Sequence, residues 1–316
     1  MNKKILVALL AVSLSLTILP TSKAEEVKPA TLAIIDTAVN SNQLEIKNNI
    51  VYEVCILDWP TCPNKTPYQE GPGSAGMPAS QIMNQGFAHG TQMVYTAINT
   101  NPNVKIVFVR FVGATADGTR QITNETSFVN ALTWVLYNKD RLNIKAVAMS
   151  QAHHDLGFTS NYCPSTPLTE KAINDLSNAG VPVFLPAGNN KDLKRISWPA
   201  CIPNSIAVSA SAYGDGPAVY TDYDPVLTDI FARGDLNSTR KDLQSGVLNP
   251  NGVYTNETGT SIANQIVASS YIALANKYPT YTSTQLIALL KTKTIPLLSR
   301  TIKNARILDS KAVLNG

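Results

Sequence analysis

The sequence predicts an α/β fold, specifically a three-layer αβα sandwich around a mostly parallel sheet. Three observations support this prediction: the chain contains apolar runs typical of buried strands, segments with helical periodicity lie between these runs, and the two kinds of segment alternate. Because a strand, a helix and a parallel strand form a right-handed crossover, this alternation is expected to build a sandwich with helices on both faces of the sheet.

Five apolar runs are interpreted as buried strands, in the order 31–35, 104–109, 145–149, 181–185 and 205–209. The predicted helices carry apolar residues at spacings of three and four, and several begin with Ser or Thr, which favour helix N-caps. They cover residues 80–98, 125–138, 166–179, 261–276 and 283–291. A site in such a sheet lies at the carboxyl ends of the strands, and Asp36, Ser150 and Pro186 each follow a predicted strand.

The N-terminus has the pattern of a secretory signal peptide. Lys3 and Lys4 precede an apolar stretch over residues 5–19, and Ser22 and Ala24 place small residues at the positions that a signal peptidase inspects. Residues 1–24 are therefore predicted to be the signal. The apolar stretch is shorter than the roughly 20 residues of a membrane-spanning helix, and no later segment is apolar enough to span a bilayer. We expect an exported protein, periplasmic or secreted, without a membrane anchor.

The charge balance argues against a polyanionic partner. Removal of residues 1–24, which hold three lysines and no acidic residue, lowers the formal net charge from +4 to +1. Binding of phosphate backbones requires clustered Lys and Arg, and the basic run over residues 191–195 is interpreted as a solvated loop. No nucleic-acid partner is expected.

Four short motifs hold the residue types of a serine-hydrolase active site. Such a site requires a hydroxyl nucleophile, an imidazole base, a carboxylate that fixes the imidazole tautomer and a donor for the developing oxyanion. The candidates are Ser261 in ETGTSIAN, His89 in FAHGTQMV, Asp36 in LAIIDTAV and Asn189 in VPVFLPAGNN. The backbone N–H of Ser261, at the start of a predicted helix, is a second candidate oxyanion donor.

Each of these residues also has an ordinary structural interpretation. Asp36 and Asn189 could be turn residues, His89 a packed core histidine, and Ser261 a helix-start residue. The presence of all four roles in one chain favours the catalytic interpretation. The motifs are far apart in the sequence, so a single sheet must gather them, and no Pro-, Gly- or Ser-rich linker divides the chain. Residues 25–316 are therefore expected to form one domain.

The order Asp, His, Ser and the residues around each motif resemble the subtilisin-like serine peptidases of family S8. Gly90 and Thr91 follow the histidine, while Gly259 and Thr260 precede the serine. The resemblance extends from about residue 31 to residue 313. It implies a subtilisin-like fold and serine endopeptidase activity.

The resemblance also implies a substrate cleft, in which a peptide pairs beside residues 150–152 as an added strand. The residues implied to contact substrate are Ser150, Gln151, Ala152, Ala187 and Gly188. Ala152 stands where the family usually has glycine, so its methyl group is expected to narrow the cleft. The other departures from the family pattern are Ala38, Gln92, Asn264 and Gln265. None removes a reacting group, and adjusted packing is expected where Gln265 replaces a common proline.

The cysteine count favours two disulfides. The spacings of the four cysteines lack the paired C-x-x-C of a metal site, and an exported chain permits oxidation. Sequence alone allows three pairings of Cys55, Cys62, Cys163 and Cys201. The resemblance favours Cys55–Cys62 with Cys163–Cys201, because relatives often link the regions around the latter pair.

The run His153, His154 and Asp155 holds metal-ligating residue types, but the geometry of a strand argues against a metal site there. Adjacent strand residues point to opposite faces, and a third partner at ligand spacing is missing. No cofactor is therefore expected. Relatives often bind structural calcium, but the sequence presents no identifiable ligand set for it.

The sequence thus predicts an exported serine endopeptidase that cleaves peptide or protein substrates through an acyl-enzyme on Ser261, and it carries no signal for an oligomeric state. Two alternatives remain open. An exported peptide-binding protein with little turnover is suggested by the altered residues near the triad and by residues 25–30, which leave no room for the pro-domain usual in secreted relatives. Esterase or transpeptidase activity would use the same acyl-enzyme with another acceptor.

Overall fold

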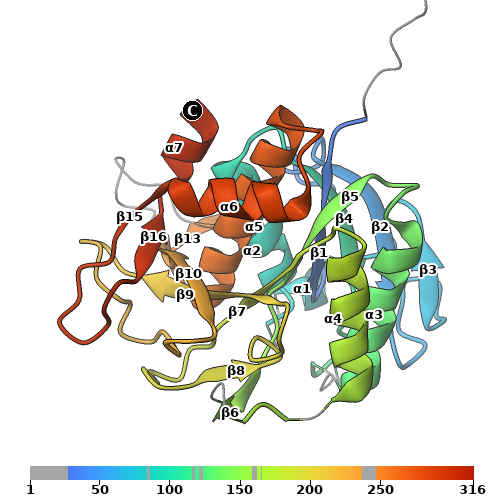
Figure 1. The fold of residues 1–316 in the computed structure, drawn as a ribbon. Coiled ribbons are helices and arrows are strands. Elements are labelled where there is room, and N and C mark those ends of the chain that lie inside the picture. Colours follow the sequence, from blue (N-terminus) through green and yellow to red (C-terminus); the bar gives the residue numbers. More distant parts are fainter. Residues whose placement is uncertain are drawn as a thin grey trace, which may run out of the picture.

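The centre of the computed structural model is a mostly parallel sheet (Figure 1). The structure describes residues 28–83, 86–115, 118–120, 124–158, 162–164, 166–236 and 247–316. Within these residues, the strands of the main sheet are, from edge to edge, β15 (Thr294–Pro296), β16 (Arg306–Leu308), β10 (Thr228–Arg233), β9 (Ile206–Ser211), β7 (Val183–Pro186), β5 (Ile144–Met149), β1 (Thr31–Asp36), β4 (Lys105–Arg110), β2 (Ile50–Ile56) and β3 (Tyr68–Glu70). The two edge strands pair antiparallel with their neighbours, and all pairs between them are parallel.

Helices cover both faces of this sheet, which confirms the predicted three-layer sandwich (Figure 1). One face is covered by α2 (His89–Thr100) and α5 (Thr260–Lys277), with α6 (Ser283–Thr292) and α7 (Ser310–Asn315) packed beside α5. The other face is covered by α3 (Glu125–Asn138) and α4 (Pro167–Asn178).

The buried strands divide their side chains between two hydrophobic cores. On β1, Leu32 and Ile34 join the core beneath α2 and α5, whereas Ala33 and Ile35 join the core beneath α3 and α4. All six residues of β1 are buried, so the strand is apolar on both faces almost to its end. Its last residue, Asp36, is a buried carboxylate that must find its partners within the protein.

Three small antiparallel sheets lie outside the main sheet in the described part of the chain. They pair β6 (His153–Phe158) with β8 (Ile196–Trp198), β11 (Asp235–Leu236) with β14 (Glu257–Thr258), and β12 (Val247–Leu248) with β13 (Tyr254–Thr255). The β11–β14 pair lies directly before the candidate nucleophile, because Gly259 alone separates β14 from the first turn of α5, which holds Ser261.

The predicted helix over residues 80–98 is wrong as a single element. The structure has a short helix, α1 (Ala79–Ile82), and a separate α2 that begins at His89. Gly86 lies between them with a φ of +77°, a conformation that ends a helix and that glycine adopts readily. The interruption places His89 at the start of a helix instead of in the middle of one. The other predicted helices and strands are confirmed to within two residues at each end.

Two disulfides are present in the structure. They join Cys55 to Cys62 and Cys163 to Cys201, with S–S distances of 2.07 and 2.02 Å. This is the pairing that the family resemblance implies.

The predicted signal peptide, residues 1–24, lies outside the described residues. Among the residues that the structure does describe, no helix combines the length and the apolar character needed to cross a bilayer. Export therefore stays a prediction from the sequence.

Candidate active site

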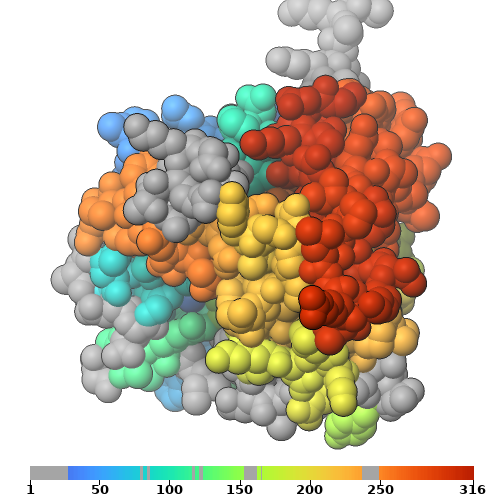
Figure 2. Space-filling view, turned by 90° about the vertical axis from the view of Figure 1, so that its left-hand side faces the viewer, coloured from blue at the N-terminus to red at the C-terminus, as the bar shows by residue number. Residues whose placement is uncertain are grey.

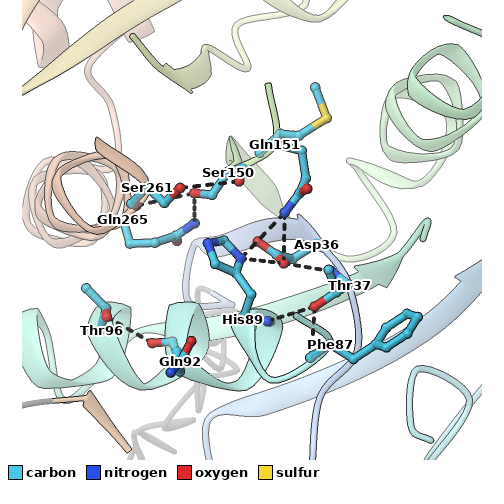
Figure 3. A network of polar contacts seen from close by, with 12 residues as sticks. Asp36, Thr37, Phe87, His89, Gln92, Thr96, Ser150, Gln151, Ser261 and Gln265 are labelled. Carbon is cyan, nitrogen blue, oxygen red and sulfur yellow. Dashed lines mark hydrogen bonds and ion pairs between the residues drawn. The ribbon is translucent and has the colours of Figure 1, made fainter. Parts of the chain in front are cut away.

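Asp36 and His89 form a hydrogen-bonded pair where β1 ends and α2 begins (Figure 3). Asp36 Oδ1 lies 2.8 Å from His89 Nδ1. The Asp36 side chain is fully buried, whereas the His89 side chain is 27% exposed. Asp36 Oδ1 also accepts the backbone N–H of Thr37 at 2.7 Å, which orients the carboxylate. A carboxylate on Nδ1 fixes the tautomer in which Nε2 is free to accept a proton.

Thr37 and Gly90 hold the start of α2 against the end of β1. The Thr37 hydroxyl donates to the Phe87 carbonyl at 2.9 Å and accepts the Gly90 backbone N–H at 3.0 Å. A β-carbon on Gly90 would lie 2.3 Å from the carbonyl oxygen of Ala38 and 2.8 Å from the ring of Phe108. Glycine at position 90 therefore allows the close approach of helix and strand that brings His89 onto Asp36.

Ser261 lies in the first turn of α5 and lines a pocket of about 190 Å³ together with His89 and Asn189. Its hydroxyl donates to the carbonyl of Ser150 at 3.4 Å, and within the described residues no hydrogen bond joins it to His89. The structure thus brings the candidate nucleophile and the candidate base to one pocket in a resting geometry. Hydrogen bonds of this kind are often long in enzymes without substrate.

Asn189 is oriented by residues at the start of α5. Its Oδ1 accepts the backbone N–H of Thr260 at 2.9 Å and the Thr260 hydroxyl at 3.0 Å. Because an N–H can only donate, this contact fixes the amide orientation and leaves Nδ2 as a donor on the pocket wall. Within the described part of the chain no acceptor engages the Ser261 backbone N–H, as is usual in a first helical turn. Both candidate oxyanion donors are therefore available.

A buried carboxylate, Asp222, supports the loop that carries Asn189. It accepts the backbone N–H groups of Asn190 and Asp192 at 2.8 and 3.0 Å, and the Asn190 amide and Ser197 hydroxyl at 2.8 and 3.3 Å. Its own backbone N–H donates to the Gly188 carbonyl at 3.0 Å. Burial raises the pKa of Asp222 above its usual value, although the hydrogen bonds that it accepts oppose this shift. No pattern in the sequence indicates this role.

Gly188 is required by this arrangement, and its substitution provides a test. At φ +116°, a β-carbon on Gly188 would lie 2.1 Å from Ser197 Oγ and 2.2 Å from Asp222 Oδ2. Gly188→Ala is therefore expected to lower the free energy of unfolding by about 3 kcal/mol or more, measured by denaturant titration. The matched control is Gly180→Ala, where φ is also positive but a β-carbon meets no atom within 4 Å. It should cost about 1 kcal/mol. Equal losses in the two variants would contradict the proposed clash.

Two buried amides on α5 fix the end of β5 to the helix. Gln265 Nε2 and Asn264 Nδ2 donate to the Ser150 hydroxyl at 2.9 and 3.3 Å, and Asn264 Nδ2 also donates to the Phe184 carbonyl at 3.1 Å. The Ser150 hydroxyl donates in turn to the Ser261 carbonyl at 3.3 Å. Asn264 and Gln265, which differ from the residues usual in the family, thus form a polar contact between the end of β5 and the helix that carries Ser261.

Gln151 contacts the Asp36–His89 pair directly, which the sequence does not indicate (Figure 3). Its Nε2 donates to Asp36 Oδ1 at 3.3 Å and lies 3.5 Å from His89 Nδ1. The guanidinium of Arg120 donates to Gln151 Oε1 and lines the same pocket. Burial lowers the pKa of Arg120, and the negative charge of Asp36 partly opposes this. Gln151 therefore helps to hold the Asp36 carboxylate while forming part of the pocket wall.

A second glutamine, Gln92, lies on α2 one turn beyond His89. Its Nε2 donates to Glu257 Oε1 at 2.8 Å, and both residues line the pocket. Gln92 stands out in the sequence as a departure from the family pattern, but Glu257 does not. No local signal marks it, because the contact joins residues that are 165 positions apart.

The expected substrate-contact residues divide into two groups. Ser150 and Gln151 line the pocket. Ala187 and Gly188 are buried and Ala152 is half-buried, and none of the three is among the residues that line it. Ala187 is occupied by backbone hydrogen bonds, which it donates to Val208 and accepts from Ser197. These bonds hold the backbone two residues before Asn189.

Within the residues that the structure describes, no group of three or more His, Cys, Asp and Glu side chains is arranged to hold a metal ion. The side chains of His153 and His154 lie outside the described part.

The fold and the residue types around the pocket point to the class of serine hydrolases. The chain belongs to the subtilase family, because the sequence model of that family, Peptidase S8, matches residues 28–312. It is similar to an alkaline protease of Alkalihalobacillus alcalophilus, 27% identical over 250 residues that cover 76% of this chain and 58% of that protein. It is equally similar to Subtilisin Savinase of Lederbergia lenta, 27% identical over 250 residues that cover 76% of this chain and 82% of that protein.

Solved structures show the same fold. A protease of Pseudoalteromonas arctica superposes with a TM-score of 0.69 over 90% of this chain and 89% of its own. At 18% identity this likeness concerns the fold alone. The resemblance to subtilisin-like serine peptidases and the subtilisin-like fold class are therefore confirmed. The chain spans 58% of the length of the alkaline protease, so that protein's activity does not pass to this chain by similarity alone.

Proposed function

We propose that this chain is an exported serine endopeptidase that hydrolyses peptide bonds of peptide or protein substrates. The observation that carries the proposal is the part-buried Asp36–His89 pair, joined at 2.8 Å, whose imidazole lines a pocket together with Ser261 and Asn189. Membership of the subtilase family and the protease names of the similar relatives support it. The N-terminal signal pattern supports export.

The first half of the reaction forms an acyl-enzyme. The Ser261 hydroxyl turns from the Ser150 carbonyl toward His89, whose Nε2 takes the hydroxyl proton as Ser261 Oγ bonds to the scissile carbonyl carbon. Asp36 stabilises the imidazolium that results. The carbon–nitrogen bond then breaks, and the departing amine takes the proton from His89.

The second half of the reaction repeats these steps with water as the nucleophile. His89 accepts a proton from the water that attacks the acyl carbon, and it returns a proton to Ser261 Oγ as the carboxylic acid leaves. In both halves the carbonyl oxygen becomes negative in the transition state. Asn189 Nδ2 and the backbone N–H of Ser261 donate hydrogen bonds to it, a role supported by the contact that orients the Asn189 amide.

Asn189→Ala tests the oxyanion role. Because the donor acts on charge that develops in the transition state, kcat is expected to fall by about 10²–10³-fold with little change in KM. The measurement is steady-state hydrolysis of a fluorogenic peptide by the parent and the variant. Circular dichroism should show the same fold, since the lost contacts to Thr260 lie at a helix start. A variant in which only KM changes would show that Asn189 is not an oxyanion donor.

A further inference from the structure

The carboxylate of Glu257 lies on the wall of the pocket that holds Ser261 and His89. Its Oε1 accepts hydrogen bonds from Gln92 Nε2 at 2.8 Å and from the Thr255 hydroxyl at 3.2 Å. Within the described residues, Oε2 has no hydrogen-bond partner and no Lys or Arg nitrogen lies within 4.0 Å of the carboxylate. Glu257 is half-buried. Glu257 therefore brings to the pocket wall a negative charge with one uncommitted oxygen. The cationic side chain that lines the same pocket, Arg120, is hydrogen-bonded to Gln151 and not to Glu257.

The two parts of a bound peptide, before and after the scissile bond, are expected to lie on opposite sides of the His89 imidazole, and Glu257 lies on one of these sides. Gln151 and Gln92 lie on opposite sides of the imidazole (Figure 3). Under the proposed function, the acyl part of a peptide pairs beside residues 150–152, on the side of Gln151. The leaving amine takes its proton from His89, so the chain after the scissile bond continues on the other side, past Gln92 and Glu257.

Glu257 is held in place from two directions. Its backbone pairs with Leu236 in the β11–β14 ladder, and on the same segment the Tyr254 ring packs against Tyr95 of α2 with ring centroids 5.6 Å apart. Figure 2 shows this orange segment at the surface, bordering the cyan region of the chain near the start of α2. A peptide that leaves the pocket on this side would meet the Glu257 carboxylate in a position fixed before binding.

We infer that Glu257 makes the cleft selective for substrates with a lysine or arginine directly after the bond that is cleaved. This inference rests on the proposed function. A cationic side chain at that position would donate a charge-assisted hydrogen bond to the free Oε2, whereas an acidic one would be repelled. Because the carboxylate is half-buried, its field is only partly screened by water.

The test uses three internally quenched peptides that differ only in the residue after the cleaved bond, which is Lys, Gln or Glu. Mass spectrometry of the products verifies that each is cut at the same bond. The parent protein is expected to cleave the Lys peptide with a kcat/KM about fivefold above that of the Gln peptide, and the Glu peptide most slowly. In Glu257→Gln the ratio of Lys to Gln peptide should fall to about one, because the variant keeps the shape and loses the charge.

Two further measurements separate selectivity from structure. Glu45→Gln removes an exposed carboxylate outside the pocket and should keep the parent ratio. Glu257→Lys should reverse the order of the Lys and Glu peptides. A purely structural role of Glu257 would lower kcat/KM for all three peptides by the same factor, and that result would overturn the inference.

The experiment also distinguishes this inference from the function on which it rests. If the peptides are cleaved but Glu257→Gln keeps the parent ratio, the inference is wrong and the endopeptidase proposal stands. If the folded parent cleaves none of the three peptides and Ser261 does not react with a serine-directed phosphonate, both are wrong. A ratio that changes with charge at position 257 supports both.

Discussion

Ser261→Ala is expected to lower turnover by about 10⁶-fold while leaving the fold intact. The variant lacks the oxygen that forms the acyl-enzyme, and the other members of the triad cannot replace it. The fold should be unaffected, because within the described residues the hydroxyl makes only a long hydrogen bond of 3.4 Å to the Ser150 carbonyl. The measurement is single-turnover cleavage of a fluorogenic peptide, with thermal unfolding recorded for both proteins.

The matched control for this variant is Ser283→Ala. Ser283 is also a serine in the first turn of a helix, α6, but it does not line the pocket. Turnover of this variant should equal that of the parent. Cleavage by Ser261→Ala within about a hundredfold of the parent rate would show that another group is the nucleophile.

His89→Ala is expected to reduce turnover by a similar factor, because the base and the nucleophile act as one unit. The double variant that combines His89→Ala and Ser261→Ala should therefore turn over no more slowly than either single variant. The three rates are measured with the same peptide. His89→Ala should also unfold at lower temperature than Ser261→Ala. Removal of the imidazole deprives the buried Asp36 of its partner at 2.8 Å, and a buried carboxylate that loses a partner is costly.

Multiplicative losses in the double variant would contradict this account, since they would mean that His89 and Ser261 contribute independently. So would a His89→Ala protein that is as stable as Ser261→Ala, because Asp36 would then not depend on the imidazole. Turnover is compared at a temperature at which both variants are fully folded, so that a stability loss is not counted as a loss of chemistry.

Local pattern in the sequence predicts a large part of the fold. It locates the five strands of continuous apolar residues and four of the five helices to within two residues. It does not reveal β2, because Glu53 interrupts the apolar pattern there, although that carboxylate is buried and accepts the backbone N–H groups of Gly73 and Ala75 at 3.0 and 3.3 Å. A glutamate can be buried in such a strand only when a loop distant in the sequence supplies hydrogen-bond donors to its carboxylate.

Some residues of the candidate site are likewise indicated by the sequence, whereas others are found only in the structure. The sequence indicates four candidates, Asp36, His89, Asn189 and Ser261, because each lies in a motif whose residues have a chemical reason to occur together. The contact of Gln151 with Asp36 spans 115 positions, and that of Gln92 with Glu257 spans 165. Contacts of this kind depend on how the sheet gathers the segments, so they leave no pattern in a single sequence.

Covalent labelling of Ser261 is the most direct test of the proposed Asp36–His89–Ser261 triad. Residues 25–316 are produced under oxidising conditions, treated with a fluorophosphonate probe and digested, and the modified residue is located by mass spectrometry. We predict a single label on Ser261 that disappears in His89→Ala, because the hydroxyl is reactive only when an imidazole takes its proton. A folded chain that stays unlabelled, or a label that persists in His89→Ala, would contradict an Asp36–His89–Ser261 triad.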